Sequence, residues 1–107
     1  MRQKRQIAQA NLKALERNAA DAAAMLKLLA NENRLLILCH LAMTDEAPVN
    51  ELADAVGLSQ SALSQHLARM REEALLATRR DAQTIYYRIA DPNAARILGV
   101  LKDIYCP

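Results

Sequence analysis

Residues 49–71, VNELADAVGLSQSALSQHLARMR, have the pattern of two short helices joined by a tight turn, and this stretch decides the fold. The first helix would bury one apolar face, made of Leu52, Ala53 and Val56. Gly57 can adopt the left-handed conformation that ends a helix without steric cost. Leu58 then fills the corner, and the Ser59 side chain can cap the second helix. The pattern predicts a helix-turn-helix over residues 50–71.

The second of these helices has an apolar face and a polar one. Leu63, Leu67 and Met70 recur at i, i+4 and i+7, which predicts a buried stripe. Short polar side chains occupy the opposite face, and they suit base edges in a DNA major groove better than catalysis. The predicted DNA contacts in this helix are Gln60, Ser61, Ser64, Gln65 and His66. For His66, a phosphate or base contact and simple packing are both open.

Length and composition favour one small helical domain spanning residues 1–107. Hydrophobic residues make up 52% of the chain, with three Tyr and no Phe or Trp. Such a composition suits close-packed helices, and at this size dimerisation adds useful burial. The net charge of +2 means that any basic surface must be local. Neither a membrane span nor a signal core is evident, so we expect a soluble, cytoplasmic protein.

Further helices are expected on both sides of the motif. Three precede it, over residues 2–17, 19–30 and 32–43, with Asn18 and Asn31 as cap-like residues between them. Residues 45–48 are predicted to be a loop. Asp91-Pro92 begins a last helix, with Pro at its first position. Its apolar side is predicted to comprise Ile97, Leu98, Leu101, Ile104 and Tyr105.

Between the motif and the last helix, the periodicity indicates a β-hairpin. Its strands are predicted at Ala77–Arg80 and Ile85–Ile89. Because the connection lacks Asn-Gly, we expect a loop longer than two residues. The whole chain is therefore predicted to be a mainly α protein, five helices followed by a hairpin wing (77–89) and a last helix. This order describes a winged helix-turn-helix.

Arginines flank the predicted wing and could bind DNA phosphates or enter a minor groove. The alternative is a solvated hairpin with ordinary surface charges. The wing residues predicted to contact DNA are Arg79, Arg80, Gln83 and Thr84, with Arg88 beside them.

Three segments together resemble the ArsR/SmtB family of winged-helix repressors. They are ANENRLLILCHL (30–41), NELADAVGLSQSALSQHLARMR (50–71) and TIYYRI (84–89), and the resemblance covers residues 19–106. It implies a homodimer whose first and last helices, 1–18 and 91–106, form the dimer contact. It also implies binding to inverted-repeat operator DNA and release when an inducer binds.

Many members of this family sense metals, but the residues of the familiar metal sites are absent. The positions of a typical Cys-x-Cys are Pro48 and Asn50, and residues 92–105 contain neither His nor Glu. Thiolates and imidazoles are the ligands that hold thiophilic or borderline metals. We therefore predict no metal and no cofactor. A Cys39/His40/Cys106 site remains an alternative, although adjacent helix residues point about 100° apart.

The two cysteines, Cys39 and Cys106, are the remaining candidates for sensing. Reduced thiols are the default in the cytosol, and Cys39 alone could be a small core residue. The placement of one Cys in RLLILC and another in IYC resembles that of a thiol-sensing subgroup of the same family. That resemblance implies that reactive sulfur species or oxidants join the two thiols by a disulfide or polysulfide and release DNA. A Cα separation beyond about 7 Å in the reduced state would favour a polysulfide or require movement of the chain.

Two other classes of function compete with a thiol-controlled repressor. A small thiol transferase would need an activated nucleophile, but Cys-x-x-Cys, a phosphate-binding Gly-rich loop and an obvious base are all missing, so no enzyme is predicted. A constitutive DNA-binding regulator with inert cysteines is the second alternative. Whether the protein represses directly or displaces a silencer also stays open.

Overall fold

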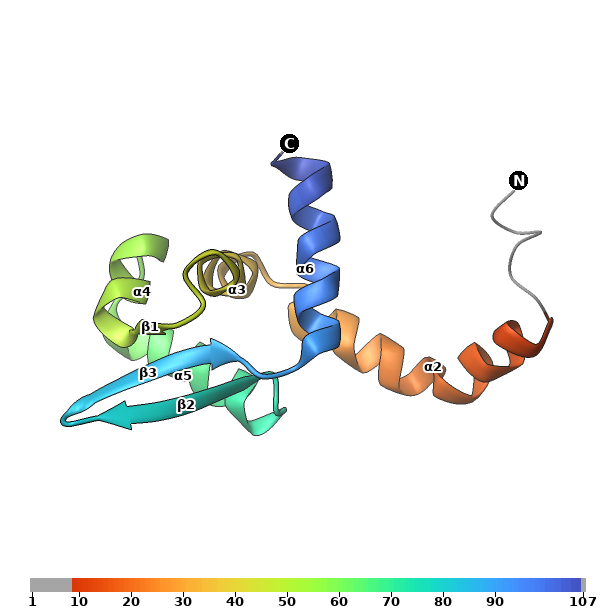
Figure 1. Ribbon diagram of the computed structural model, residues 1–107, viewed down its shortest axis with the longest axis horizontal. Helices are drawn as coiled ribbons and strands as arrows, with labels where there is room; N and C mark the ends of the chain where they lie inside the picture. Colours follow the sequence, from red (N-terminus) through yellow and green to blue (C-terminus); the bar gives the residue numbers. More distant parts are fainter. Residues whose placement is uncertain (1–8, 107) are drawn as a thin grey trace.

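The computed structural model describes residues 9–106, and these form five helices and three strands. The helices are α2 (Gln9–Leu29), α3 (Glu32–Thr44), α4 (Val49–Val56), α5 (Gln60–Glu72) and α6 (Pro92–Tyr105). The strands are β1 (Ala47–Pro48), β2 (Leu76–Asp81) and β3 (Thr84–Ile89). Figure 1 shows that α3 to α6 and the sheet form the body, while most of α2 extends away from it. The predicted winged helix-turn-helix fold is confirmed.

The N-terminal part of the described chain is one helix, not two. The expected break at Asn18 is wrong, since α2 continues through this residue. Asn18 Nδ2 donates to the carbonyl oxygen of Ala14 (2.9 Å), so the side chain bonds back to the preceding turn rather than capping a new helix. Residues 1–8 of the predicted first helix lie outside the described residues.

The predicted caps around the motif are confirmed. Ser59 Oγ accepts from the Ala62 backbone N–H at 3.2 Å, and Asn31 Oδ1 accepts from that of Arg34 at 3.1 Å. Asp91 Oδ1 accepts from the N–H of Asn93 at 2.8 Å, with Pro92 at the start of α6. Gly57 ends α4 in the left-handed conformation, with φ 70° and ψ 31°. Gly57 therefore ends α4 and Ser59 begins α5 as the local sequence predicts, while α4 begins after Pro48 without a side-chain cap.

The sheet differs from the prediction in two places. Residues 47 and 48, expected in a loop, form β1, which pairs antiparallel with β3 in the order β1-β3-β2. Asp81 pairs with Thr84, so the hairpin loop has two residues and the prediction of a longer loop is wrong. Ala82 provides the positive φ (56°) that such a turn requires at its first position, a place that glycine usually takes.

The core brings together α3, the motif, the base of the wing and α6. Its fully buried large side chains are Ile37, Leu38, Leu41, Leu52, Leu63, Leu67, Met70, Leu75 and Leu98. The predicted apolar side of α6 is only partly buried, because Ile104 and Tyr105 remain exposed. Exposed apolar residues also occur on α2, where Leu12, Leu15 and Leu26 face solvent. None of the described helices is long and apolar enough to cross a membrane.

Candidate DNA interface and thiol cavity

The polar face of α5 is available for a ligand. Its buried stripe packs into the core as predicted, and the side chains opposite that stripe are exposed, namely Gln60, Ser61, Ser64 and Gln65. No acidic residue lies in the first turn, and Arg69 and Arg71 lie in the last. A helix N-terminus without acidic side chains is compatible with nearby phosphates. The geometry therefore suits a recognition helix.

His66 is partly buried and has an internal partner. Its Nδ1 accepts a hydrogen bond from Arg34 Nε (3.4 Å), and Arg34 Nη1 also donates to the carbonyl oxygen of Leu28 (3.3 Å). Arg34 thus connects the C-terminal end of α2 with α5. The sequence left both internal packing and DNA contact open for His66. The structure shows an internal contact with Arg34, and a DNA contact by His66 stays a prediction. Arg34 was missed because its partner is distant in the sequence.

The far end of the wing carries the polar residues expected there. Gln83 lies in the two-residue turn, Thr84 begins β3, and both are exposed. Figure 1 shows the β2–β3 hairpin reaching well beyond the helices. Arg80 and Arg88 are also exposed, and among the described residues neither forms a salt bridge. Their guanidinium groups are therefore free to meet phosphates.

Arg79 differs from its neighbour because its charge is already paired. Its guanidinium forms a two-point ion pair with Glu46, in which Nε lies 2.8 Å from Oε2 and 3.0 Å from Oε1. The guanidinium carbon also lies 4.4 Å from the centre of the Tyr86 ring. Hydrogen bonding by Arg79 holds the pKa of the Glu46 carboxyl below its usual range. A DNA contact by Arg79 stays a prediction, and the sequence had given no sign of this pairing.

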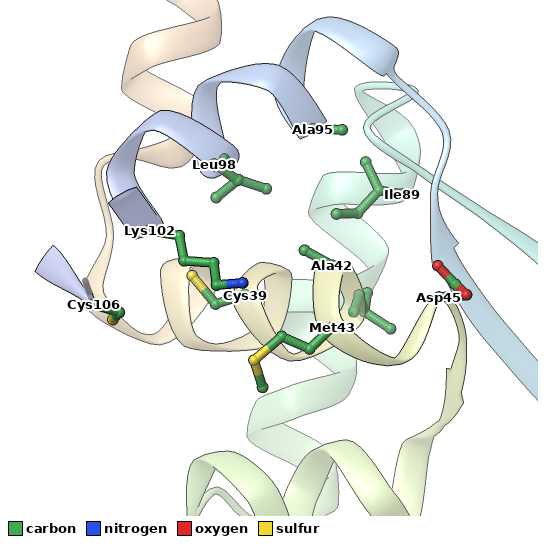
Figure 2. Close-up of a pocket in the computed structure, with 11 residues that line it drawn as sticks. Cys39, Ala42, Met43, Asp45, Ile89, Ala95, Leu98, Lys102 and Cys106 are labelled. Atoms are coloured by element: carbon green, nitrogen blue, oxygen red, sulfur yellow. The ribbon is translucent and has the colours of Figure 1, made fainter. Parts of the chain in front are cut away.

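The two thiols lie on the wall of one cavity between α3 and α6. Cys39 is partly buried on α3, Cys106 is exposed directly after α6, and both are free. The cavity has a volume of about 760 Å³. Figure 2 shows the lining residues, which also include Met43, Asp45, Leu98 and Lys102. The structure thus brings the two predicted sensing residues to one site.

Burial raises the pKa of the Cys39 thiol, and the nearby Cys106 raises it further because two thiolates would repel each other. Cys39 is therefore mostly protonated near neutral pH. Since the thiolate is the nucleophile, Cys39 needs help from its surroundings to react quickly.

The alternative metal site is not assembled in the described part of the chain. No group of three or more His, Cys, Asp or Glu residues there is arranged to hold a metal ion. His40 Nε2 instead lies 2.9 Å from Glu51 Oε2, which links α3 to α4. Within residues 9–106, His40 is therefore part of a contact between helices.

Comparisons with known proteins agree with this geometry. The family described as "Bacterial regulatory protein, arsR family" matches residues 31–78. The transcriptional activator HlyU of Vibrio cholerae is 45% identical over 96 residues, which are 90% of this chain and 88% of that protein. A biofilm growth-associated repressor of Agrobacterium fabrum is 41% identical, over 89% of this chain and 80% of its own.

A solved structure extends the similarity to three dimensions. Reduced HlyU from Vibrio cholerae superimposes with a TM-score of 0.82 at 43% identity, covering 89% of this chain and 99% of that chain. The family match covers α3, the motif and the first part of the wing. The relatives that match about nine tenths of this chain are transcription regulators rather than enzymes. This chain belongs to the ArsR family of DNA-binding winged-helix transcriptional regulators.

Proposed function

We propose that this regulator is a homodimeric repressor that releases its inverted-repeat operator when reactive sulfur species or oxidants link Cys39 to Cys106. The link would be a disulfide or a longer sulfur chain. One observation carries the proposal: two cysteines that are far apart in the sequence, one on α3 and one directly after α6, line the same cavity. Both thiols are free, so neither is already held in another bond.

The proposed DNA contact combines α5 with the wing. The exposed polar residues of α5 would read base edges, with Gln60 and Ser64 as the main readers. Arg80 would bind phosphate, which adds affinity without sequence preference. Arg79 would hold the wing in place through Glu46 and Tyr86.

Exposed apolar residues support a dimer through α2 and α6. Leu12, Leu15 and Leu26 on α2, together with Val100, Ile104 and Tyr105 on α6, are large apolar side chains at least 47% exposed. Burial of such a surface against a second copy would be favourable at about 25 cal/mol per Å² of apolar area. The two recognition helices would then face successive half-sites of the operator.

A link between the thiols would connect the two parts that set this geometry. Cys39 belongs to α3, which leads through β1 into the motif, and Cys106 ends the helix of the proposed dimer contact. Half-sites about one DNA turn apart demand a fixed spacing of the recognition helices. A coupling of about 1–3 kcal/mol would lower operator affinity about 5- to 150-fold.

Operator titrations test the proposal. Fully reduced, diamide-treated and polysulfide-treated protein would be titrated with operator DNA, and mass spectrometry of the intact protein would count the sulfur atoms in the link. We expect weaker binding after both treatments and no response in Cys39→Ser or Cys106→Ser. Equal affinity in all three states of the wild type would refute the switch.

A constitutive regulator is the second candidate, and one observation favours it. Cys39 packs against the hydrophobic core, as an inert structural cysteine would. In that case, alkylation of both thiols would leave operator affinity unchanged. The relatives bear the names of both an activator and a repressor, so reporter expression with and without the protein would establish the direction of regulation.

A further inference from the structure

The cavity between α3 and α6 is much larger than a sulfur chain requires. Its volume is about 760 Å³, within the range of about 300–1,000 Å³ typical of sites for small organic molecules. A water molecule takes up about 30 Å³ in the liquid, so an inorganic polysulfide of a few atoms would fill little of this space. The lining is mainly apolar, with Leu41, Ala42, Met43, Ile89, Ala95 and Leu98 among its residues. Such a lining suits the apolar part of a small organic molecule.

The charged residues of the lining are separated. Figure 2 shows Lys102 and Cys106 at one side of the cavity and Asp45 at the opposite side. Lys102 lies one turn before Cys106, whose backbone N–H donates to the Lys102 carbonyl oxygen (2.7 Å). The Lys102 ammonium would thus attract an anionic group, and the Asp45 carboxylate would repel one. This polarity would orient a bound molecule.

From this arrangement, we propose that the cavity binds a small organic disulfide with an apolar body and one anionic group, and presents its S–S bond to Cys39. This inference rests on the proposed function in one respect only: the proposed function says that the reaction releases DNA. Binding and reaction at Cys39 can be measured without DNA.

The reaction consists of two thiol–disulfide exchanges. The Cys39 thiolate, formed by loss of its proton to water, attacks one sulfur of R–S–S–R′. This attack forms Cys39–S–S–R and expels R′–S⁻, which takes a proton from water. The Cys106 thiolate then attacks Cys39 Sγ, forms the Cys39–Cys106 disulfide and expels R–S⁻. In total, two protein thiols are oxidised and one organic disulfide is reduced to two thiols.

Binding explains how a partly buried thiol could be the selective one. Burial disfavours the Cys39 thiolate, so random encounters with reagents in solution are unproductive. A reagent held in the cavity gains effective concentration beside this thiol. Cys106 is exposed, so its reaction rate should depend little on the shape of the reagent.

Charge selectivity is the first test. In Cys106→Ser, only Cys39 can react. Absorbance would follow the release of thionitrobenzoate from 5,5′-dithiobis(2-nitrobenzoate), which carries one carboxylate on each half, and of thiopyridone from neutral dithiodipyridine. Lys102→Gln should slow the anionic reagent about fivefold, as expected for about 1 kcal/mol of charge attraction, and leave the neutral one unchanged. Arg96→Gln removes a charge from α6 outside this cavity and should change neither rate. Equal slowing by both variants would overturn the role of Lys102.

Shape selectivity is the second test. Gly99 lines the cavity, and a Cβ added there would meet no atom within 4 Å, so alanine fits and the atoms of a longer side chain would extend from that open position. Gly99→Leu should slow both aryl disulfides at least about fivefold while leaving inorganic polysulfide unaffected, and Gly99→Ala should have a smaller effect. Unchanged aryl rates in Gly99→Leu, with circular dichroism showing a folded protein, would overturn the cavity as the binding site.

Operator titration separates this inference from the proposed function. If the aryl disulfide reacts selectively at Cys39 but the oxidised wild type keeps its operator, the cavity stands and the switch fails. If inorganic polysulfide releases the operator while the Lys102 and Gly99 variants behave as wild type toward aryl disulfides, the switch stands and the organic ligand is refuted.

Discussion

The DNA-reading end and the thiol cavity are built in opposite ways. The reading end comprises α4, α5 and the hairpin, which follow one another in the chain and are held by caps, a glycine turn and a two-residue loop. The cavity forms between α3 and α6, which the whole motif and wing separate in the sequence. The comparison shows that a recognition surface can be specified locally, whereas the site that would control it depends on packing of distant segments.

The two ends also differ in how tightly they are packed. Leu63, Leu67 and Met70 anchor α5 with at most 1% of each residue exposed. The cavity wall is mixed: Leu41 and Leu98 are each 1% exposed, whereas Cys39 is only partly buried and Met43 is 68% exposed. A densely packed end keeps the spacing of its reading residues, while the open end has room for a ligand and for chemistry.

The largest expected effect is the loss of a buried leucine from the reading end. Leu63→Ala would remove a fully buried side chain and should lower the free energy of unfolding by about 2–5 kcal/mol. Leu36→Ala on α3, where the residue is 49% exposed, is the matched control and should cost less than about 1 kcal/mol. Urea titrations would measure both variants. Similar losses would contradict the burial of Leu63 in the core.

Thiol reactivity should separate Cys39 from Cys106. Because burial raises the pKa of Cys39 above its usual value, its thiolate fraction should keep rising with pH between pH 7 and pH 9, even in Cys106→Ser, where the neighbouring thiol is removed. We expect iodoacetamide alkylation of Cys39 in Cys106→Ser to follow this rise without a plateau. Cys106 in Cys39→Ser should be faster at pH 7. A plateau for Cys39 below pH 8 would show that its thiolate is not disfavoured.

One substitution at two glycines should have opposite effects. Gly57→Ala in the reading motif would place a side chain at φ 70° and should destabilise the protein by about 1 kcal/mol. Gly99→Ala on the cavity wall lies inside α6 with open space around it, and should stabilise by about 0.4–1 kcal/mol. Thermal unfolding of the two variants beside wild type would show the signs. Destabilisation by Gly99→Ala would mean that the cavity is not open there.

The smallest effect is expected from single arginines of the wing. Arg80→Ala should weaken binding to operator and random DNA alike, and reduce the slope of log K against log salt by about 0.9. Arg79→Ala should reduce the slope by less, because part of its charge is already paired with Glu46. Fluorescence anisotropy over a range of salt would measure both. Equal reductions would show that Arg79 leaves Glu46 to bind phosphate.

Gln60, which is proposed to contact bases, should behave differently from these arginines of the wing. Gln60→Ala should reduce the preference for operator over random DNA while the salt slope stays the same. An unchanged preference would mean that α5 is not docked as proposed.

Interactions between residues close in the sequence could be predicted, whereas interactions between distant residues could not. Ser59, Gly57 and Asp91 act within one helical turn, so their roles could be predicted from neighbouring residues. The helix break at Asn18 was wrong because asparagine favours a cap without requiring one. The longer wing loop was wrong because a two-residue turn can form without Asn-Gly when Ala82 takes the positive φ. The pairing of Arg79 with Glu46 joins residues that are adjacent only in the folded protein.

The sequence by itself determined the motif, its caps, the wing and the polar face of α5, because periodicity and capping act over a few residues. It also supplied the two cysteines and excluded the familiar metal ligands. Only the tertiary structure decided which charges are free: it paired Arg79 with Glu46, turned His66 toward Arg34 and left Arg80 exposed. It also brought Cys39 and Cys106 to one cavity beside Lys102, because α3 and α6 bury their apolar faces against the same core.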